Sequence, residues 1–466
     1  MCLKCKYIIQ EIKMKVGFVS LGCSKNLIDT EMMIGVFKNN NFTIVADPAE
    51  AEVIVVNTCG FIESAKEEAI NTILEMAEYK KIGKCKILVA TGCLVERYKE
   101  ELEKAIPEVD IFLKYSDYAE EKGKSAEIFA NVLERIYAKY QNENNQKTEN
   151  TELNFMDRVV TTGKNYAYLR IAEGCSNRCT YCAIPNIRGS FVSRKIEDII
   201  EEAKKLVASG RRELIIIAQD TSKYGKDIYG EAKLAELLSK LCKIEDLKWI
   251  RFLYCYPEDI TDELIKVVKE NDKICKYFDI PVQHISDKIL KRMNRKTTSD
   301  SIKEKIAKLR EQIPGVVIRT TVMVGFPGED EEDFKKLYDF IKETKFEKLG
   351  AFSYSKEEGT PAATFKDQIH PMTKKSRYNK IMKLQNEISK EIEKNLIGKK
   401  VEILIEGITS DEKYYVGRSY MDVPDIDGLA YIKVQDNTID RDLIGQYVNA
   451  KIVDTKDYDI ICEEER

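Results

Sequence analysis

Along the first hundred residues, short apolar runs alternate with longer segments whose apolar positions repeat at helical spacing. Three of the runs are apolar on both faces, as in strands of a covered parallel sheet: Val16 to Leu21, Val53 to Asn57 and Ile87 to Thr91. Apolar residues recur with a period of about 3.6 in Asn26 to Phe37 and in Glu63 to Tyr79. This βαβαβ order predicts a small doubly wound parallel-sheet domain over residues 14–138.

A second alternation of strands and helices begins at Tyr166. Helical patterns separate six strand-like runs: Ala167 to Ile171, Glu213 to Ala218, Ile250 to Tyr254, Tyr277 to Ile280, Val316 to Val324 and Leu349 to Tyr354. Six βα units in about 190 residues predict a partial (βα)6 barrel over residues 158–373, with its chemistry at the carboxyl ends of the strands.

The remaining segments are expected to connect or follow these two domains. Residues 139–157 form a predicted polar linker, because Gln141 to Asn154 contains a single apolar residue, Leu153. Residues 374–397 are predicted to be a charged, solvated connecting helix. Residues 398–466 change to short alternating strands with turn signals, which predicts a small antiparallel β-barrel. The fold class is therefore α/β, with three domains.

Composition agrees with a globular chain. Of the 466 residues, 43% are hydrophobic, 33% are charged and only 10 are proline, which excludes disordered and collagen-like classes. No apolar stretch approaches the length of about 18 residues that a membrane span needs. Residues 1–13 lack the apolar centre of a signal peptide, so we expect a cytoplasmic protein. Cys2 and Cys5 in this extension have no second pair to complete a zinc site.

The sharpest chemical signal is a Cx3Cx2C motif, Cys175, Cys179 and Cys182, placed just after the first strand of the predicted barrel. Three thiolates can hold three irons of a 4Fe-4S cluster and leave the fourth iron open to another ligand. Structural thiols and structural zinc are the alternatives. Zinc would need a fourth Cys or His nearby, and the only histidines are His284 and His370.

A second set of cysteines is spread more widely. Cys23, Cys59 and Cys93 each follow one of the three amino-terminal strands by one or two residues. Parallel strands end on the same side of a sheet, so the three thiols are expected to meet at one crevice and hold a second open cluster. Chance placement or a structural role are the alternatives. Five other cysteines in apolar runs are expected to be core residues: Cys85, Cys242, Cys255, Cys275 and Cys462.

The Cx3Cx2C after the first strand of a (βα)6 pattern resembles the radical S-adenosylmethionine superfamily. The resemblance implies that the open iron binds the methionine part of the cofactor, and that an electron splits it to a 5'-deoxyadenosyl radical. It implies that Tyr181 lies beside the adenine and that the turn from Gly325 to Glu329 binds the cofactor; ordinary loop packing and a plain βα turn are the alternatives. Arg319 is a further candidate for cofactor binding.

Two more side chains are expected near the carboxyl ends of the barrel strands. Gln219 lies on a strand that ends there, although one sequence does not fix its direction. His284 follows the fourth strand, and a hydrogen-bonded structural histidine is the alternative to a functional one. Apart from the cluster ligands, no side chain is assigned to catalysis.

Two open clusters followed by a β-barrel resemble the methylthiotransferases, whose carboxyl-terminal domain is a TRAM domain. The resemblance narrows to the branch that modifies ribosomal small-subunit protein uS12, and the motifs that carry it are Ser20 to Asn26, Arg170 to Gly189, Asp279 to His284 and Pro424 to Gly428. It implies methylthiolation of the β-carbon of an aspartate in uS12, with two molecules of S-adenosylmethionine and a sulfur carried at the amino-terminal cluster. It also implies a low-potential electron donor such as flavodoxin or ferredoxin.

Two other functions compete with this one. A transfer-RNA methylthiotransferase acting on a modified adenosine would carry the same clusters. A non-catalytic iron-sulfur protein is the third candidate, but electron carriers usually complete their set of cysteines.

Local charge bears on the choice of substrate. The whole chain has a formal charge of only -4, but residues 398–466 hold 16 acidic and 9 basic residues, a balance of -7. A surface of this sign would attract a basic ribosomal protein and repel a nucleic acid, so we expect no stable nucleic-acid binding by this domain. Asp422, Asp425 and Asp427 are the predicted substrate-binding residues. A merely solubilising acidic surface is the alternative.

Overall fold

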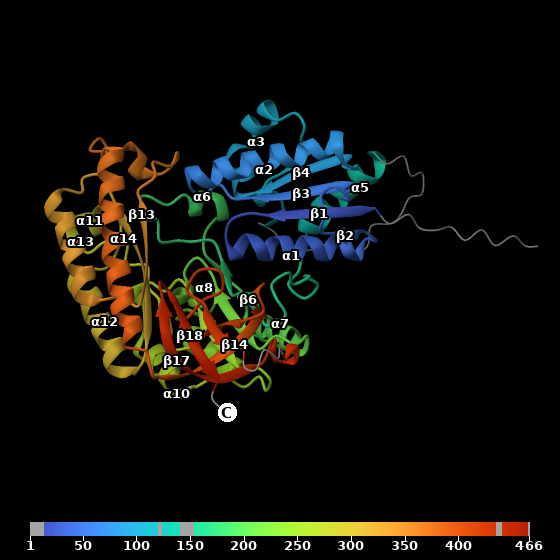
Figure 1. Ribbon diagram of the computed structural model, residues 1–466. Coiled ribbons are helices and arrows are strands. Elements are labelled where there is room, and N and C mark those ends of the chain that lie inside the picture. The colour runs from blue at the N-terminus through green and yellow to red at the C-terminus, as the bar shows by residue number, and fades with distance from the viewer. Residues whose placement is uncertain (1–13, 120–123, 140–152, 435–439, 465–466) are drawn as a thin grey trace, which may run out of the picture. The chain divides into compact units, whose positions relative to one another are not determined.

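The computed structural model describes residues 14–119, 124–139, 153–434 and 440–464 (Figure 1). The chain forms two compact units, Met1–Thr161 and Thr162–Arg466. The predicted Cys2/Cys5 extension and most of the predicted linker lie outside the described residues. In the described part, no helix is both long enough and apolar enough to cross a membrane.

The first unit contains a parallel five-stranded sheet in the order β2-β1-β3-β4-β5. Its strands are β1 (Lys15–Ser20), β2 (Thr43–Val45), β3 (Val53–Thr58), β4 (Ile87–Gly92) and β5 (Ile111–Leu113). Its helices are α1 (Ser24–Asn39), α2 (Glu63–Ile82), α3 (Cys93–Ala105), α4 (Tyr115–Ala119) and α5 (Lys124–Lys139). The three predicted strands are the central ones, β1, β3 and β4, whereas the flanking strands were missed because each has only three residues.

Helices cover both faces of this sheet, which confirms the doubly wound class. One core joins Val16, Val53 and Val89 of the strands to side chains of α1 and α5, such as Phe37 and Leu133. A second core on the other face is built by α2 and α3 (Figure 1). Every residue of β3 and β4 is buried, as the continuous apolar runs predicted.

The boundary of the first unit lies later than expected. Arg158 forms a buried ion pair with Glu31 of α1, with Nη1 2.6 Å from Oε2. The backbone N–H of Thr161 donates to the same carboxylate at 2.7 Å. Residues up to 161 are thereby anchored to the amino-terminal unit, although the barrel domain was predicted to begin at 158.

The second unit contains the six predicted parallel strands: β6 (Tyr166–Arg170), β9 (Glu213–Ile217), β10 (Trp249–Phe252), β11 (Tyr277–Asp279), β12 (Val317–Val324) and β13 (Lys348–Ser353). They form sheets of order β10-β9-β6 and β11-β12-β13. The N–H of Cys255 donates to the carbonyl of Asp279 at 2.8 Å and links the two sheets. A short hairpin that was not predicted, β7 (Ala172–Glu173) with β8 (Val192–Ser193), follows the first strand.

Helices fill the intervals between these strands. They are α6 (Ile184–Arg188), α7 (Ile196–Ala208), α8 (Lys226–Tyr229), α9 (Leu234–Leu241), α10 (Asp262–Glu270), α11 (Asp287–Arg292), α12 (Ser299–Gln312) and α13 (Glu331–Thr344). The long helix α14 (Pro371–Lys394) packs against β13 and α13. Its residues Ile381, Leu384 and Ile388 are buried, so one face of the predicted solvated helix belongs to the core.

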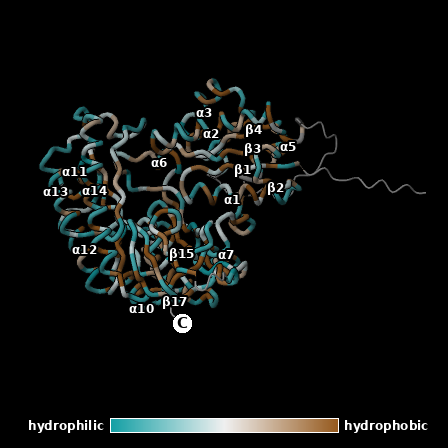
Figure 2. The backbone as a smooth tube through the Cα atoms, viewed as in Figure 1, coloured by the Kyte–Doolittle hydropathy of each residue, from teal (hydrophilic) through white to brown (hydrophobic). Residues whose placement is uncertain are grey.

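The chain ends in a closed barrel of order β14-β15-β16-β18-β17. The strands are β14 (Lys400–Ile408), β15 (Tyr414–Ser419), β16 (Ala430–Lys433), β17 (Tyr447–Lys456) and β18 (Asp459–Glu464). The expected antiparallel barrel needs one correction, because β16 and β18 pair in parallel and so close the ring. Figure 2 shows hydrophobic residues concentrated along the strands.

A buried charge network joins the barrel to the parallel strands. Glu213 of β9 lies between two guanidinium groups: its Oε1 is 3.1 Å from Arg251 Nε and its Oε2 is 2.8 Å from Arg418 Nη2. Arg251 also donates to the carbonyl of Tyr420 at 2.6 Å. Burial alone would raise the pKa of Glu213, but Arg418 and Arg251 together hold that pKa below its usual range. Buried ion pairs thus hold the barrel domain against the parallel strands of the second unit.

Candidate active site

Within the first unit, the carboxyl ends of three adjacent strands bring three cysteines together. Cys23 precedes α1, Cys59 follows β3, and Cys93 begins α3 directly after β4. Their exposure falls in that order, since Cys23 is exposed, Cys59 is half-buried and Cys93 is buried. Burial raises the pKa of the Cys59 thiol, and the neighbouring Cys23 adds to the rise.

Asn26, in the first turn of α1, ties the three strand ends to one another. Its Nδ2 donates to the carbonyls of Leu21 at 3.0 Å and Thr58 at 2.9 Å. Its Oδ1 accepts a hydrogen bond from the Cys93 thiol at 3.6 Å. One side chain therefore fixes the loops that carry all three thiols. No functional role had been predicted for Asn26.

Glycines allow these loops to approach closely. A Cβ atom on Gly22 would lie 2.9 Å from the sulfur of Cys59. Gly92 has a φ of +94°, and a Cβ there would lie 2.3 Å from Asn57 Oδ1. A side chain at either position would push the thiols apart.

The Cx3Cx2C loop of the second unit follows β7. Cys175 and Cys179 are buried and Cys182 is half-buried. The N–H of Cys175 donates to the carbonyl of Gly189 at 3.1 Å, which pins the start of the loop. Burial raises the pKa of the Cys175 thiol and raises that of Cys182 to about 12. Metal binding requires the thiolate, so iron would displace these protons.

A polar cluster precedes the cysteine loop. Glu173 lies 2.7 Å from Arg170 and 3.5 Å from Arg188, and it accepts a hydrogen bond from the side-chain amide of Gln219. Burial opposes the charge on Glu173, but Arg188 and Arg170 outweigh it and hold the pKa below its usual range. The Gln219 side chain thus points toward the cysteine loop.

The residue sets of both units suit open clusters. Each set offers three thiols and no fourth cysteine, so one iron would stay open. Among the described residues, no three Cys, His, Asp or Glu side chains converge on a point that would hold a single metal ion. In a 4Fe-4S cluster each thiolate binds a different iron, and the three sulfurs need not share one point.

Tyr181 and the predicted cofactor turn meet in space. The Tyr181 ring packs edge-on against Phe326 of the turn, with centroids 6.5 Å apart. Phe326 in turn contacts Tyr354 at 5.4 Å. Gly325 adopts a φ of +71°, and a Cβ there would lie 2.4 Å from Lys374 Cγ, so only glycine fits this turn. The structure thereby forms an aromatic wall beside the cysteine loop.

The Glu329 carboxylate is wholly buried within the turn. It accepts the N–H of Gly325 at 2.7 Å, and Arg377 donates to it at 2.7 Å. Burial raises its pKa to about 7 although Arg377 opposes the rise. Its side chain holds the predicted cofactor turn from within, and direct contact of Glu329 with the cofactor stays a prediction.

His284 is also buried, with no exposed side-chain surface. Its Nδ1 accepts the backbone N–H of Ser286 at 2.9 Å, so Nε2 carries the proton and lies 3.7 Å from Glu329. Burial lowers its pKa to about 3, which keeps the ring neutral. The ring is hydrogen-bonded at Nδ1 but not at Nε2, and the choice between a structural and a functional histidine stays open.

Arg319 is the third residue of β12. Its guanidinium is 3.1 Å from Asp279 and 3.7 Å from Asp427 of the barrel domain. Arg319 is thus engaged at the junction with the barrel, and its cofactor role stays a prediction.

The predicted substrate-binding aspartates are divided by the structure. Asp422 is buried and lies 2.8 Å from Lys348, and the Asp427 carboxylate is buried against Arg319 and the Tyr277 hydroxyl. Both are internal partners of the junction and cannot meet a substrate there. Asp425 is exposed, with its Oδ2 3.3 Å from the Tyr166 hydroxyl.

The surface charge of the barrel is smaller than the chain count indicated. Among its described residues, eight acidic and seven basic residues are exposed, since others are buried or half-buried. The exposed acidic residues are Asp411, Glu412, Asp425, Asp440, Asp442, Asp454, Asp457 and Glu463. With an exposed balance this close to zero among the described residues, the expected preference for a basic protein over RNA stays a prediction.

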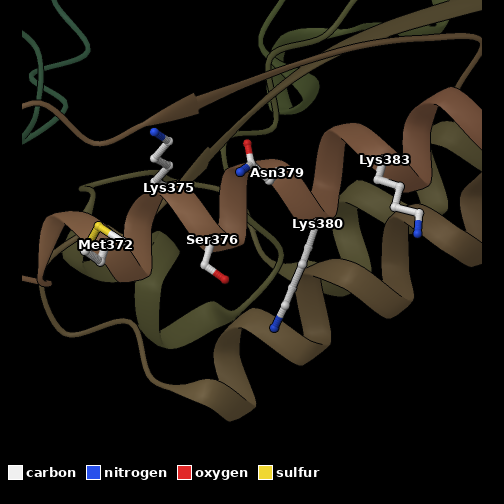
Figure 3. Close-up of a pocket in the computed structure, with 6 residues that line it drawn as sticks. All are labelled: Met372, Lys375, Ser376, Asn379, Lys380 and Lys383. Carbon is white, nitrogen blue, oxygen red and sulfur yellow. The ribbon is translucent and has the colours of Figure 1, made fainter.

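A shallow depression of about 440 Å³ lies elsewhere, on the outer face of α14 (Figure 3). All six lining residues come from this helix, including Lys375, Lys380 and Lys383. None of them is a cysteine or a carboxylate, so this depression offers no ligand for a metal.

Three segments of the chain match known families. Residues 15–114 match the uncharacterized protein family UPF0004, residues 169–341 the radical SAM superfamily, and residues 397–463 the TRAM domain. The two cysteine triads lie in the first two of these segments.

Similarity to individual proteins extends over nearly the whole chain. It is 58% identical over 451 residues to the ribosomal protein uS12 methylthiotransferase RimO of Alkaliphilus oremlandii, covering 97% of this chain and 99% of that protein. Proteins of the same name are 52% identical in Clostridium perfringens, with 97% and 99% covered, and 49% identical in Acetivibrio thermocellus, with 97% and 98% covered.

A solved structure also shares the fold. The radical S-adenosylmethionine methyltransferase TsrM from Kitasatospora setae, with cobalamin and a 4Fe-4S cluster bound, matches with a TM-score of 0.54 at 12% identity. The match covers 75% of this chain and 77% of that one. At this identity the likeness shows the fold alone.

Proposed function

The chain belongs to the uS12 methylthiotransferase family of radical S-adenosylmethionine enzymes, and we propose that it transfers a methylthio group to ribosomal protein uS12. The observation that carries this proposal is the presence of two cysteine triads at the carboxyl ends of parallel strands, one in each unit. Each triad offers three thiols and leaves one iron of a cluster open. Two open clusters in one chain suit a reaction that combines radical formation with delivery of sulfur.

The residues around the second triad would hold and shield the cofactor. A reduced 4Fe-4S cluster at Cys175, Cys179 and Cys182 would supply the electron that splits S-adenosylmethionine into methionine and a 5'-deoxyadenosyl radical. Tyr181 and Phe326 provide an apolar wall beside that loop. Such a wall keeps water from a reactive centre, which suits hydrogen abstraction from an unactivated carbon.

The finer features of the reaction follow from the same family membership. We propose that the acceptor is the β-carbon of an aspartate in uS12, and that two molecules of S-adenosylmethionine are used, one for the methyl group and one for the radical. The sulfur is held at the cluster of Cys23, Cys59 and Cys93. A low-potential flavodoxin or ferredoxin supplies the electrons, and the substrate places the reaction in the cytoplasm.

The test is anaerobic incubation of the reconstituted protein with purified uS12, S-adenosylmethionine and reductant, followed by mass spectrometry of uS12. An added methylthio group on an aspartate is expected. A parallel reaction contains transfer RNA, because the exposed charge of the barrel does not discriminate between the two substrates. Modification of an adenosine with none of uS12 would refute the proposed substrate.

Two single variants test the division of labour between the triads. Cys175→Ala should abolish formation of 5'-deoxyadenosine, whereas Cys59→Ala should keep part of it and lose methylthio transfer. The two thiols lie in separate compact units, so neither substitution should disturb the other triad. Equal loss of cleavage in both folded variants would contradict the assignment.

A further inference from the structure

The last residue of α11 and the two residues after it are hydrogen-bonded to the Cx3Cx2C loop. The carbonyl of Arg292 accepts the Thr180 hydroxyl at 2.9 Å, and the carbonyl of Met293 accepts the Thr180 N–H at 3.0 Å. The side-chain amide of Asn294 donates to the carbonyl of Arg178 at 2.9 Å. The next residue along the chain is therefore held in a fixed position relative to the three thiols.

That residue is Arg295, whose guanidinium is buried without a full set of partners. Only 6% of Arg295 is exposed. Its Nη2 donates to the carbonyl of Pro281 at 2.9 Å, but Nε and Nη1 have no hydrogen-bond partner. A buried cation with two unsatisfied donors is costly, and its presence calls for a ligand that the protein itself does not supply.

The surroundings of Arg295 lead back to the cysteine loop. Its guanidinium carbon lies 4.0 Å from the centre of the Tyr256 ring, and the Tyr256 hydroxyl is 3.6 Å from the sulfur of Cys179. An arginine guanidinium stays protonated in proteins, and this one stacks on the ring whose hydroxyl faces the Cys179 sulfur. A single tyrosine side chain therefore separates the positive charge from a predicted cluster ligand.

We propose that Arg295 raises the reduction potential of the 4Fe-4S cluster at the Cx3Cx2C loop, by its charge and by N–H donation to cluster sulfur from Nε and Nη1. The inference rests on the proposed function in requiring a cluster at these cysteines. Three thiolates make the cluster anionic, and one electron from the low-potential donor adds a further negative charge without breaking a bond. Net charge and hydrogen bonds to sulfur are the levers by which a protein sets such a potential, and both favour the reduced form here.

The test measures the midpoint potential and not activity. The full chain, with the cysteines at 23, 59 and 93 replaced by Ala so that one cluster remains, is reconstituted anaerobically and titrated without S-adenosylmethionine. Electron paramagnetic resonance follows the reduced cluster. In Arg295→Gln the ratio of reduced to oxidised cluster at a fixed potential should fall at least tenfold, which is about 59 mV for a one-electron couple.

Arg292→Gln is the matched control from the same segment. Its half-buried guanidinium pairs with the Asp367 carboxylate at 2.7 Å and donates to the carbonyl of Pro327 at 3.0 Å, so its charge is already compensated and the midpoint measured without S-adenosylmethionine should not move. Arg295→Lys keeps the charge but loses the planar fork, and its midpoint should fall by less than that of Arg295→Gln. If Arg295→Gln does not retain iron, Arg295→Lys decides the test.

Two outcomes would overturn the inference. One is an unchanged midpoint in an iron-replete Arg295→Gln or, where that variant holds no iron, in Arg295→Lys. The other is an unchanged midpoint with weakened binding of S-adenosylmethionine, which would make Arg295 a cofactor clamp. Failure of the parent protein to assemble any cluster would instead refute the proposed function, so the two failures are distinguishable by iron analysis.

Discussion

Replacing Glu213 with glutamine should loosen the carboxyl-terminal barrel from the parallel strands that it contacts. The Glu213 carboxylate is completely buried and serves as counter-ion for Arg251 and Arg418. The change removes the carboxylate paired with Arg251, which keeps backbone carbonyls, the Tyr277 ring and a neutral amide oxygen, whereas Arg418 keeps Glu406 at 2.7 Å. We therefore expect a cost of about 3 kcal/mol, the lower end of the range for breaking a buried ion pair.

The single tryptophan of the chain reports on this junction. Trp249 of β10 packs edge-on against Tyr447 of the barrel, with ring centroids 4.8 Å apart. Its fluorescence during urea unfolding therefore follows separation of the two parts. With a denaturant dependence of about 2–3 kcal/mol per M, the expected loss lowers the urea midpoint by about 1–1.5 M.

An exposed ion pair of the same barrel supplies the control. Arg441 and Glu412 lie 2.9 Å apart with side chains 70% and 56% exposed, so Arg441→Met should cost at most about 1 kcal/mol. A Glu213→Gln midpoint equal to that of the wild type, or shifted no more than the control, would refute the reasoning.

The stabilisation by the Glu213 carboxylate should also depend on pH. The folded pKa of Glu213 is depressed below its ordinary value of 4.5, because Arg418 and Arg251 outweigh the effect of burial. Its contribution to stability is thus fully present above pH 4.5 and is lost as the pH falls through the folded pKa. The difference between wild type and Glu213→Gln should be constant from pH 8 to about 5 and shrink below that.

Three further outcomes are expected. Replacing all three cysteines of the Cx3Cx2C loop with alanine should remove half of the reconstituted iron, and unchanged iron analysis would contradict a cluster there. Gly92→Ala places a Cβ 2.3 Å from Asn57 Oδ1 at a φ of +94°, so it should cost at least about 1–3 kcal/mol and lower iron at the amino-terminal triad only. Because burial lowers the pKa of His284 to about 3 from 6.5, its contribution to stability is complete above pH 6.5 and declines as the pH falls toward 3. Between pH 7 and pH 5 the wild type should therefore lose about 2 kcal/mol that His284→Gln does not lose, as measured by urea unfolding; equal losses would exclude this role.

The sequence by itself determined the longer parallel strands and predicted that the thiols group at their ends, whereas it gave no signal for the short strands β2, β5, β7 and β8. An apolar run as short as Val53 to Asn57 is typical of a strand buried on both faces, and β3 is buried at every residue. Since parallel strands end on one side of a sheet, the positions of Cys23, Cys59 and Cys93 after successive strands already predicted that they meet. Each strand is a local feature, so the periodicity of neighbouring residues predicts it. The position of each cysteine relative to its own strand is also local.

Only the tertiary structure decided which charged groups are exposed and which are paired. The acidic composition of the barrel domain led us to predict that Asp422 and Asp427 bind the substrate. In the structure both carboxylates are buried at the junction, where Asp422 pairs with Lys348 and Asp427 lies beside Arg319. Partners of this kind are remote in the chain: Arg418 and Glu213 are separated by 205 residues.

The same limit hid the residues that support the cysteines. Tyr256 lies 77 residues beyond Cys179, yet its hydroxyl faces the Cys179 sulfur. Arg295, which lies between β11 and β12, packs against the Tyr256 ring. No local periodicity marks such residues, because burial of a polar group is set by the segments that fold over it. The spacing of hydrophobic residues encodes the framework, whereas desolvation and pairing of charge arise only when distant segments pack together.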